Sequence, residues 1–277
     1  MSNNIIERSF KYQEFVKFVK ETPNHKSNSR LKKSEDTEDK VWSGSENFNE
    51  SLEWAESGWD SGLKQLELEQ GILTGTGMEV SPSMQGSLVN IGNYLNGLPN
   101  NMWEFTEERE FNLDPLTVYV PMGYTSSSDG LKAMEFCKKT IKYINVLQSK
   151  FNTRVISVQL TNLRAQGKII CTQVLLKDYD ERFVLNNIAF AFQPSFFRRL
   201  YFKYLETIAN MCSGYGSSAR TPQILNYIES SRKDTDRSIL IPSLNDVIGS
   251  GEYFTKQMEI MGFSPNLKEI EDEASKL

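Results

Sequence analysis

Two polar loops carry the residues that could support chemistry in this sequence. Asp178-Tyr-Asp180 directly follows a predicted strand, which is where α/β sheets place their ligands. The loop Pro121–Asp129 (PMGYTSSSD) leads into a predicted helix, and serine hydroxyls with backbone N–H groups at a helix N-terminus suit an anion or a metal. The sequence identifies no basic or metal-binding partner for the aspartate pair, so a polar turn leaving a strand is the alternative. We therefore predict no enzyme, no bound metal and no cofactor.

The densest basic cluster lies in Gln193–Leu205 (QPSFFRRLYFKYL), where Arg198, Arg199 and Lys203 stand among five aromatic residues. Guanidinium groups beside aromatic rings can bind phosphates and stack on bases. Within a predicted helix over Ser195–Met211, an apolar stripe would face the core (Phe197, Leu200, Tyr201, Tyr204 and Leu205). Arg198, Arg199 and Phe202 would then face outward, which predicts a core helix with a basic outer face.

The charge of the protein is divided unevenly along its length. The net charge is −5, but the segment from Lys132 to Lys203 holds thirteen basic and four acidic residues, which makes it +9 and the remainder −14. A clustered positive segment is the pattern expected of a polyanion site, although ordinary solvated lysines covered by acidic segments would give the same count. The predicted nucleic-acid-binding residues are Lys138, Lys139, Lys142, Arg198, Arg199 and Lys203.

Three of the four tryptophans (Trp42, Trp54 and Trp59) fall within 18 residues. The spacing predicts a helix capped by Ser45 and stopped at Gly58, followed by a second helix over Asp60–Gln70. The tryptophans then form either a small aromatic core between these helices or a platform on which bases stack. Residues 41–103 are interpreted as one small Trp-rich region of helices and turns.

The flanking regions have simpler patterns. Residues 1–22 predict an amphipathic helix, and a polar stretch up to Lys40 predicts a linker that lets this helix sit away from the main body or dock on a partner. Residues 71–103 predict turns, a short hairpin and a helix near Leu88–Leu95. This segment contains no G-x-G-x-x-G and no phosphate-binding G-x-x-x-x-G-K-[ST] motif.

From residue 104 to 265 the pattern predicts an α/β (or α+β) domain with a mixed sheet and flanking helices. Trp103–Phe111 is predicted as an edge strand and Leu116–Pro121 as a buried strand. Gly167 suits a hairpin. The remaining predicted elements are the helix Ser128–Lys150, the strands Val155–Leu160 and Lys168–Leu176, the helix Thr221–Arg232, the strand Ile239–Ile241 and the helix Gly251–Gly262. Residues 266–277 form an acidic tail.

Composition limits the class of protein further. The 277 residues include one histidine, His25, and three separated cysteines without a C-x-x-C, so neither a disulfide framework nor a cysteine zinc site is expected. No apolar run approaches the roughly 20 residues of a bilayer span, and the start, MSNNIIERSF, shows no secretory signal. We expect a soluble protein of the cytoplasm of a host cell, with no membrane partner.

Two resemblances accompany these patterns. The β-α-β-β order resembles a von Willebrand A-type domain, but Tyr124 stands where the aspartate of its D-x-S-x-S metal site is expected, so the likeness implies architecture only. Three motifs resemble an uncharacterised family of tailed-phage and mobile-element proteins. They are W-x-G followed by G-W-x-x-G (Trp42–Gly62), L-x-G-x-P-x-x-M (Leu95–Met102) and R-R-L-x-F (Arg198–Phe202). This resemblance implies a phage-encoded protein and carries no catalytic residues across.

Two functional hypotheses follow. The first is a phage-encoded, non-enzymatic nucleic-acid-binding accessory protein of viral transcription or replication, with DNA a more suitable ligand than RNA. A viral or host polymerase or replication protein would then be its protein partner. The alternative is a protein-interaction module, an adaptor or inhibitor of a host or viral complex without direct nucleic-acid contact.

Overall fold

The larger sheet of the protein contains six strands. The computed structural model describes residues 4–23, 34, 39–66, 78–83, 88–89, 93–94, 98–99, 102–107, 113–123, 130–148, 151–163, 167–181, 184–209, 217–218, 221–231 and 237–241. The sheet order is β1-β7-β6-β5-β9. The short strand β8 pairs with the C-terminal end of β6, beyond the part of β6 that pairs with β5. The strands are β1 (Asn4–Lys11), β5 (Pro115–Pro121), β6 (Asn152–Leu163), β7 (Lys168–Lys177), β8 (Ser217–Ser218) and β9 (Ser238–Leu240).

The sheet is mixed. β5 runs parallel to both β6 and β9, β7 runs antiparallel to β6, and β1 runs parallel to β7. Gly167 has a φ of 60°, which suits the tight connection between β6 and β7. The predicted α/β class with a mixed sheet and flanking helices is therefore confirmed.

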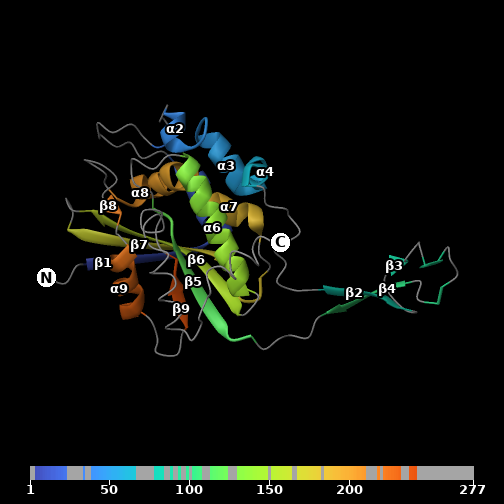
Figure 1. Cartoon of the computed structure of the whole chain (residues 1–277). Coiled ribbons are helices and arrows are strands. Elements are labelled where there is room, and N and C mark those ends of the chain that lie inside the picture. The colour runs from blue at the N-terminus through green and yellow to red at the C-terminus, as the bar shows by residue number, and fades with distance from the viewer. Residues whose placement is uncertain are drawn as a thin grey trace.

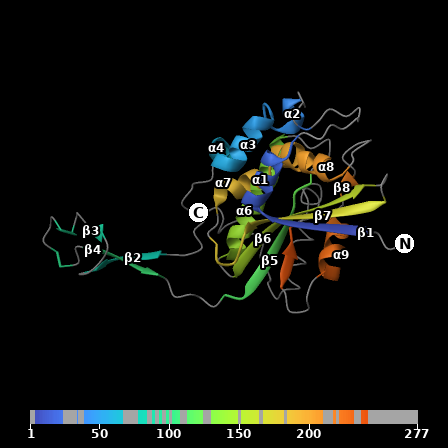
Figure 2. The same ribbon diagram turned by 180° about the vertical axis from the view of Figure 1, so that it is seen from behind.

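Helices cover both faces of this sheet and make three layers (Figures 1 and 2). One face packs against a large core that includes residues of α1, α3, α4, α6, α7 and α8, and the other face packs against α9 in a smaller core. The helices are α1 (Tyr12–Glu21), α2 (Lys40–Ser43), α3 (Phe48–Ser57), α4 (Asp60–Leu66), α6 (Gly130–Gln148), α7 (Leu185–Ala191), the π-helix η2 (Phe196–Tyr201), α8 (Phe202–Ile208) and α9 (Thr221–Ser231).

A second, smaller sheet projects from this body (Figure 1). It contains β2 (Met78–Ser83), β3 (Leu88–Val89) and β4 (Met102–Glu107) in the antiparallel order β2-β4-β3. The strand predicted at Trp103–Phe111 is thus present as β4, but it lies in the centre of this sheet and not at an edge. The helix predicted near Leu88–Leu95 is wrong at its start, because Leu88 and Val89 pair with β4.

The N-terminus differs most from the prediction. Asn4–Lys11 is not helical but forms β1, which pairs along its whole length with β7. The amphipathic helix begins only at Tyr12, and its buried Phe15, Val16 and Val19 join the large core. The prediction of a helix that sits away from the main body is therefore wrong.

Most other predicted elements of the 104–265 region occur within a few residues of their expected bounds. The differences are mainly extensions, such as β6, which begins at Asn152 and not at Val155. The predicted helix Ser195–Met211 is split into η2 and α8. The predicted helix Gly251–Gly262, most of the 22–40 linker and the acidic tail lie outside the described residues.

Candidate functional site

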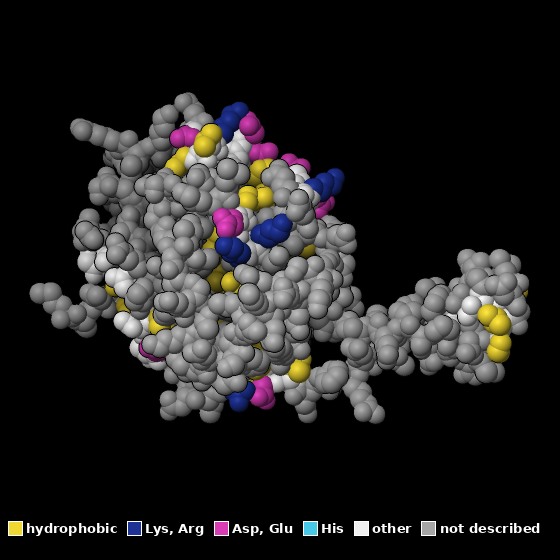
Figure 3. Space-filling view, in the orientation of Figure 1, with side chains coloured by type: hydrophobic (Ala, Val, Ile, Leu, Met, Phe, Trp, Pro, Cys, Tyr) yellow, Lys and Arg dark blue, Asp and Glu magenta, His cyan; other side chains and the backbone are white. Residues whose placement is uncertain are grey.

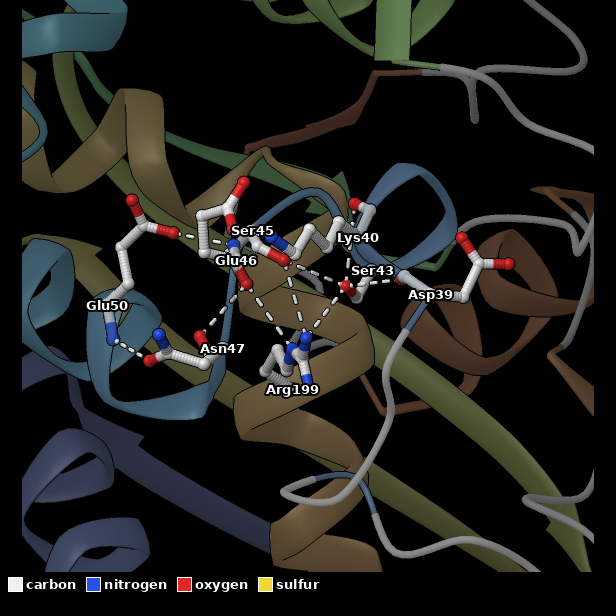
Figure 4. Close-up of polar contacts among 8 residues, drawn as sticks. All are labelled: Asp39, Lys40, Ser43, Ser45, Glu46, Asn47, Glu50 and Arg199. Carbon is white, nitrogen blue, oxygen red and sulfur yellow. Dashed lines mark hydrogen bonds and ion pairs between the residues drawn. The ribbon is translucent and has the colours of Figure 1, made fainter.

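Arg199, the centre of the predicted basic cluster, is fully buried. Its guanidinium donates through Nη1 to the carbonyl of Ser34 at 2.9 Å and through Nη2 to Ser43 Oγ at 2.9 Å. Longer contacts of 3.3 Å reach Ser45 Oγ from Nε and the Ser45 carbonyl from Nη2. The side chain thus fills a cradle of neutral oxygen atoms from the N-terminal part of the protein, as Figure 4 shows.

Arg198 and Lys203 are also taken up by the N-terminal part of the protein. Arg198 is 1% exposed, lies 4.9 Å from the ring centre of Trp42 and donates to the Trp42 carbonyl. Lys203 is 6% exposed and its ammonium lies 4.6 Å from the ring centre of Phe48. Cation–π contacts of this kind stabilise a buried positive charge.

Short capping interactions fix the shape of the 39–47 segment that covers these cations. Asp39 accepts a hydrogen bond from the backbone N–H of Trp42 at the start of α2, and Asn47 accepts one from Glu50 N at the start of α3 (Figure 4). Between the two caps, Gly44 has a φ of 78°, and a Cβ there would lie 3.2 Å from Ser195 N. The segment can therefore approach the start of η2 closely.

Ser34, which precedes this segment in the sequence, is held by α8. Its backbone N–H and hydroxyl both bond to the carboxylate of Glu206 on α8, at 2.8 and 3.1 Å. Burial lowers the pKa of Arg199 and the charge of Glu50 opposes that shift. Because an arginine pKa lies far above neutral, the guanidinium stays charged and keeps its donors in place.

The predicted outward orientation of Arg198, Arg199 and Phe202 is wrong. The apolar stripe of this helix does face the core, since Tyr201 donates to or accepts from Thr161 on β6 at 2.8 Å. The opposite face is covered by Ser34 and by residues of the segment 39–48, which the sequence pattern had assigned to other regions. Arg198, Arg199 and Lys203 thus connect η2 and α8 to the N-terminal part of the protein. Because all three side chains are buried, they are not accessible to phosphate groups.

Of the lysines of α6, the structure describes the side chains of Lys138 and Lys139. Lys139 is exposed but pairs with Glu135 one turn away at 2.7 Å, and Lys138 is half-buried. Lys142 lies on the same helix, and its side chain is outside those that the structure describes. On the face drawn in Figure 3, the coloured Lys and Arg side chains lie beside Asp and Glu side chains.

The tryptophans form packing contacts. Trp54 and Trp59 lie 6.1 Å apart and both approach Phe190 of α7, at 5.9 and 6.5 Å. The aromatic-core interpretation is confirmed for this pair, although the core includes α7. Trp42 lies elsewhere, against Arg198 and Phe202.

The aspartate pair and the residues that lead into the serine loop lie at opposite ends of β5. Asp178 and Asp180 follow β7, which is antiparallel to β6, so they lie beside the start of β6; the loop after β5 starts at the opposite end of the sheet. The residues from Tyr124 to Asp129 lie outside the described part. Within that part, no group of three or more His, Cys, Asp or Glu side chains could hold a metal ion.

Asp178 does have a basic partner, which the sequence did not reveal. Arg154 Nε donates to Asp178 Oδ1 at 2.7 Å, and the Arg154 guanidinium lies 4.3 Å from the ring centre of Tyr179. Burial would raise the pKa of Asp178, but hydrogen bonds from Arg154 and from the Tyr179 N–H lower it below its ordinary value. The register of β6 against β7 brings these residues together, and only a correct strand pairing could have predicted it.

Lys177, at the end of β7, is buried and donates to the carbonyls of Thr153 at 2.7 Å and Asp178 at 3.0 Å. Burial lowers its pKa, and the neighbouring acids partly oppose this. Six of the thirteen basic residues between Lys132 and Lys203 are thus engaged within the protein: Lys139, Arg154, Lys177, Arg198, Arg199 and Lys203. The excess positive charge of this segment is largely structural among the described residues.

Comparisons with known proteins identify a family for this chain. A family model described as a domain of unknown function, DUF7192, matches residues 5–262. No curated protein and no solved structure matches the sequence. Of the helices that the structure describes, none combines the length and apolar character that a bilayer crossing requires.

Proposed function

The chain belongs to the DUF7192 family of domains of unknown function, and we propose that it is a protein-interaction module that docks on a protein complex through its small projecting sheet. The phage origin implied by the sequence motifs, and a host or viral complex as the target, are part of this proposal. The observation that carries it is a pair of exposed apolar side chains on the projection. We call the projection, which spans Met78–Glu107, the arm.

The arm presents Tyr94 and Leu98 to solvent. They are 63% and 47% exposed, and Leu98 N donates to the Asn93 carbonyl at 3.0 Å, which keeps the two side chains near each other. Figure 3 shows hydrophobic side chains at the far end of the arm. Exposed aromatic and aliphatic side chains on a projection are typical of contact sites, because burying their apolar surface against a partner stabilises the complex.

The strands of the arm also disfavour a partner that would add a strand to the edge of this sheet. Pro82 stands in β2, the outer strand, and lacks the N–H that a further strand would need. β3, the other outer strand, is two residues long. A partner is therefore expected to bind Tyr94 and Leu98 rather than to extend the sheet.

DNA binding stays a prediction that now lacks its main support. It rested on an outward basic face of Arg198, Arg199 and Lys203, and those side chains are buried. The protein-interaction hypothesis also needs a different contact element. It rested in part on an N-terminal helix that could detach from the body, and that helix is part of the core. The arm replaces it as the interaction element.

Photo-crosslinking tests the proposal. A benzophenone amino acid at position 94 should capture a defined protein from lysate of cells in which the protein is made, before and after nuclease treatment. The double substitution Tyr94→Ser/Leu98→Ser should abolish co-purification of that protein. Val41→Ser removes an even more exposed apolar side chain from the body and serves as the matched control.

The outcomes separate the hypotheses. Capture at position 94 that survives nuclease supports the proposal when co-purification of the captured protein is lost in the arm variant and persists in the Val41 variant. Equal co-purification with both variants places the contact elsewhere and rejects the arm. Capture that disappears with nuclease means that nucleic acid bridges the partners, which would restore the nucleic-acid hypothesis.

A further inference from the structure

A row of polar residues crosses one end of the large sheet. The strand pairings place Ser238, Thr117, Arg154 and Asp178 side by side on β9, β5, β6 and the end of β7. One step along the same face, the pair Tyr119 and Leu240 belongs to the core under α9. The row thus begins where the contacts of the α9 core end.

Within this row the guanidinium of Arg154 is held in one orientation. Its Nε is bonded to Asp178, and its plane lies over Tyr179. Asp178 is itself fixed, because Oδ1 accepts from the Tyr179 N–H at 2.9 Å and its own N–H donates to Glu181 Oε2 at 3.0 Å. The Tyr179 hydroxyl lies 2.9 Å from Thr117 Oγ1, which anchors the ring.

The outer edge of this guanidinium has spare donors. Nη1 and Nη2 of Arg154 form no hydrogen bond with the described residues, and the side chain is 37% exposed. An arginine presents these two nitrogens as a planar fork that matches the two oxygens of a carboxylate. Arginine and tyrosine, stacked here on each other, are also among the residue types most often found at the energetic centre of protein interfaces.

The surrounding charges favour a monoanion over a dianion. Glu181 pairs with Lys11 at 3.8 Å and with the Asp178 N–H, while Asp180 is exposed. Among the described residues around Arg154, three cations (Lys11, Arg154 and Lys177) face three acids (Asp178, Asp180 and Glu181), so these six charges sum to zero. A phosphate dianion meets more repulsion from these acids than a carboxylate does.

We propose that Arg154, supported by Asp178 and Tyr179, binds a carboxylate of a partner protein at this end of the sheet. The carboxylate comes either from an aspartate or glutamate residue of the partner or from its C-terminus, and these groups have the same chemistry. This site is separate from the arm. Its test uses peptides, so the two proposals fail independently.

The experiment is a titration of the full-length protein, observed through the Nε–Hε NMR signal of Arg154. One peptide is a capped pentapeptide with a single aspartate, and a second has asparagine in its place and a free C-terminal carboxylate. A capped asparagine peptide and inorganic phosphate complete the set. We expect saturable shifts with one or both carboxylate peptides and none with the capped asparagine peptide; the peptide that binds identifies the source.

Variants test the assignment. Arg154→Lys keeps the charge but loses both the fork and the Nε–Hε signal, so this variant and the wild type are compared through the backbone N–H signal of Tyr179. Binding should weaken at least about fivefold, because a bidentate arginine contact is lost. Arg237→Lys makes the same change at another surface arginine, which pairs with Asp114 at 2.6 Å, and should leave binding unchanged. The proposal is overturned if neither carboxylate peptide shifts the wild-type signal, if phosphate alone binds, or if both variants bind equally well.

Discussion

Replacing Arg199 by alanine should destabilise the protein strongly, because the side chain is a buried anchor. The two 2.9 Å hydrogen bonds from its charged nitrogens account for roughly 1.5 kcal/mol each at the lower end of the range for charged donors. The substitution also destabilises the protein by leaving the Ser34 carbonyl and the Ser43 hydroxyl buried without this donor. One effect acts in the opposite direction, because the variant no longer has to bury the charge of the guanidinium. We expect a net loss of about 3–4 kcal/mol, close to the range for breaking a buried charged network.

Urea unfolding followed by tryptophan fluorescence measures this loss, because three tryptophans lie on or beside the elements that Arg199 fastens. Lys139→Ala is the matched control: it removes an exposed cation with one helical ion pair and should cost about 0.3–0.5 kcal/mol. Ser43→Ala in both backgrounds should show coupling with Arg199 of about 1 kcal/mol. A change of less than about 0.5 kcal/mol in the Arg199 variant would refute burial, since surface substitutions stay within that range.

Three further outcomes are expected. Gly58→Ala should lower the free energy of unfolding by about 1–2 kcal/mol in a thermal melt, because φ is +99° and a Cβ would meet Asn186 Nδ2 at 2.9 Å. The Cys137 thiol should resist alkylation in the native protein and react in urea, as peptide mass spectrometry would show, because burial raises its pKa to about 12. Asp178 has a lowered pKa in the folded protein, so its pairing with Arg154 stabilises above the ordinary carboxyl pKa of about 3.9 and is lost as pH falls through the lower folded value. Asp178→Asn should therefore reduce the drop in urea midpoint between pH 7 and pH 2.5, by an amount worth under about 1 kcal/mol because the pair is partly exposed.

The elements that the sequence predicted well are those with their own periodicity. The stripe of α6 and the apolar run of β5 each specify a conformation that the large core then uses. β1 failed because Ile5 and Ile6 carry too short a signal, and its strand conformation depends on pairing with β7, more than 150 residues away. Tertiary pairing of this kind has no local pattern.

The prediction that Arg198 and Arg199 face solvent was wrong for a related reason. A helical projection shows that Arg198 and Arg199 lie off the apolar stripe, but it cannot show whether water or another segment covers that face. Here the cover is the 39–47 segment with Ser34, and every acceptor that it offers to Arg199 is a hydroxyl or a backbone carbonyl. A search of the sequence for acidic partners of Arg199 would not have pointed to these neutral oxygens.

Two of the three motifs that suggested the phage family contact each other in the structure. The first motif begins at Trp42-Ser43-Gly44-Ser45, and the last begins at Arg198-Arg199. Trp42 supplies the ring and carbonyl for Arg198, while the two serines receive Arg199. Gly44 allows the close approach to Ser195 that this contact needs. The basic residues of one motif and the serines of the other, which suggested a nucleic-acid site and a helix start, therefore form one internal contact. The arm and the edge at Arg154 are the two surfaces through which we propose that the protein meets its partners.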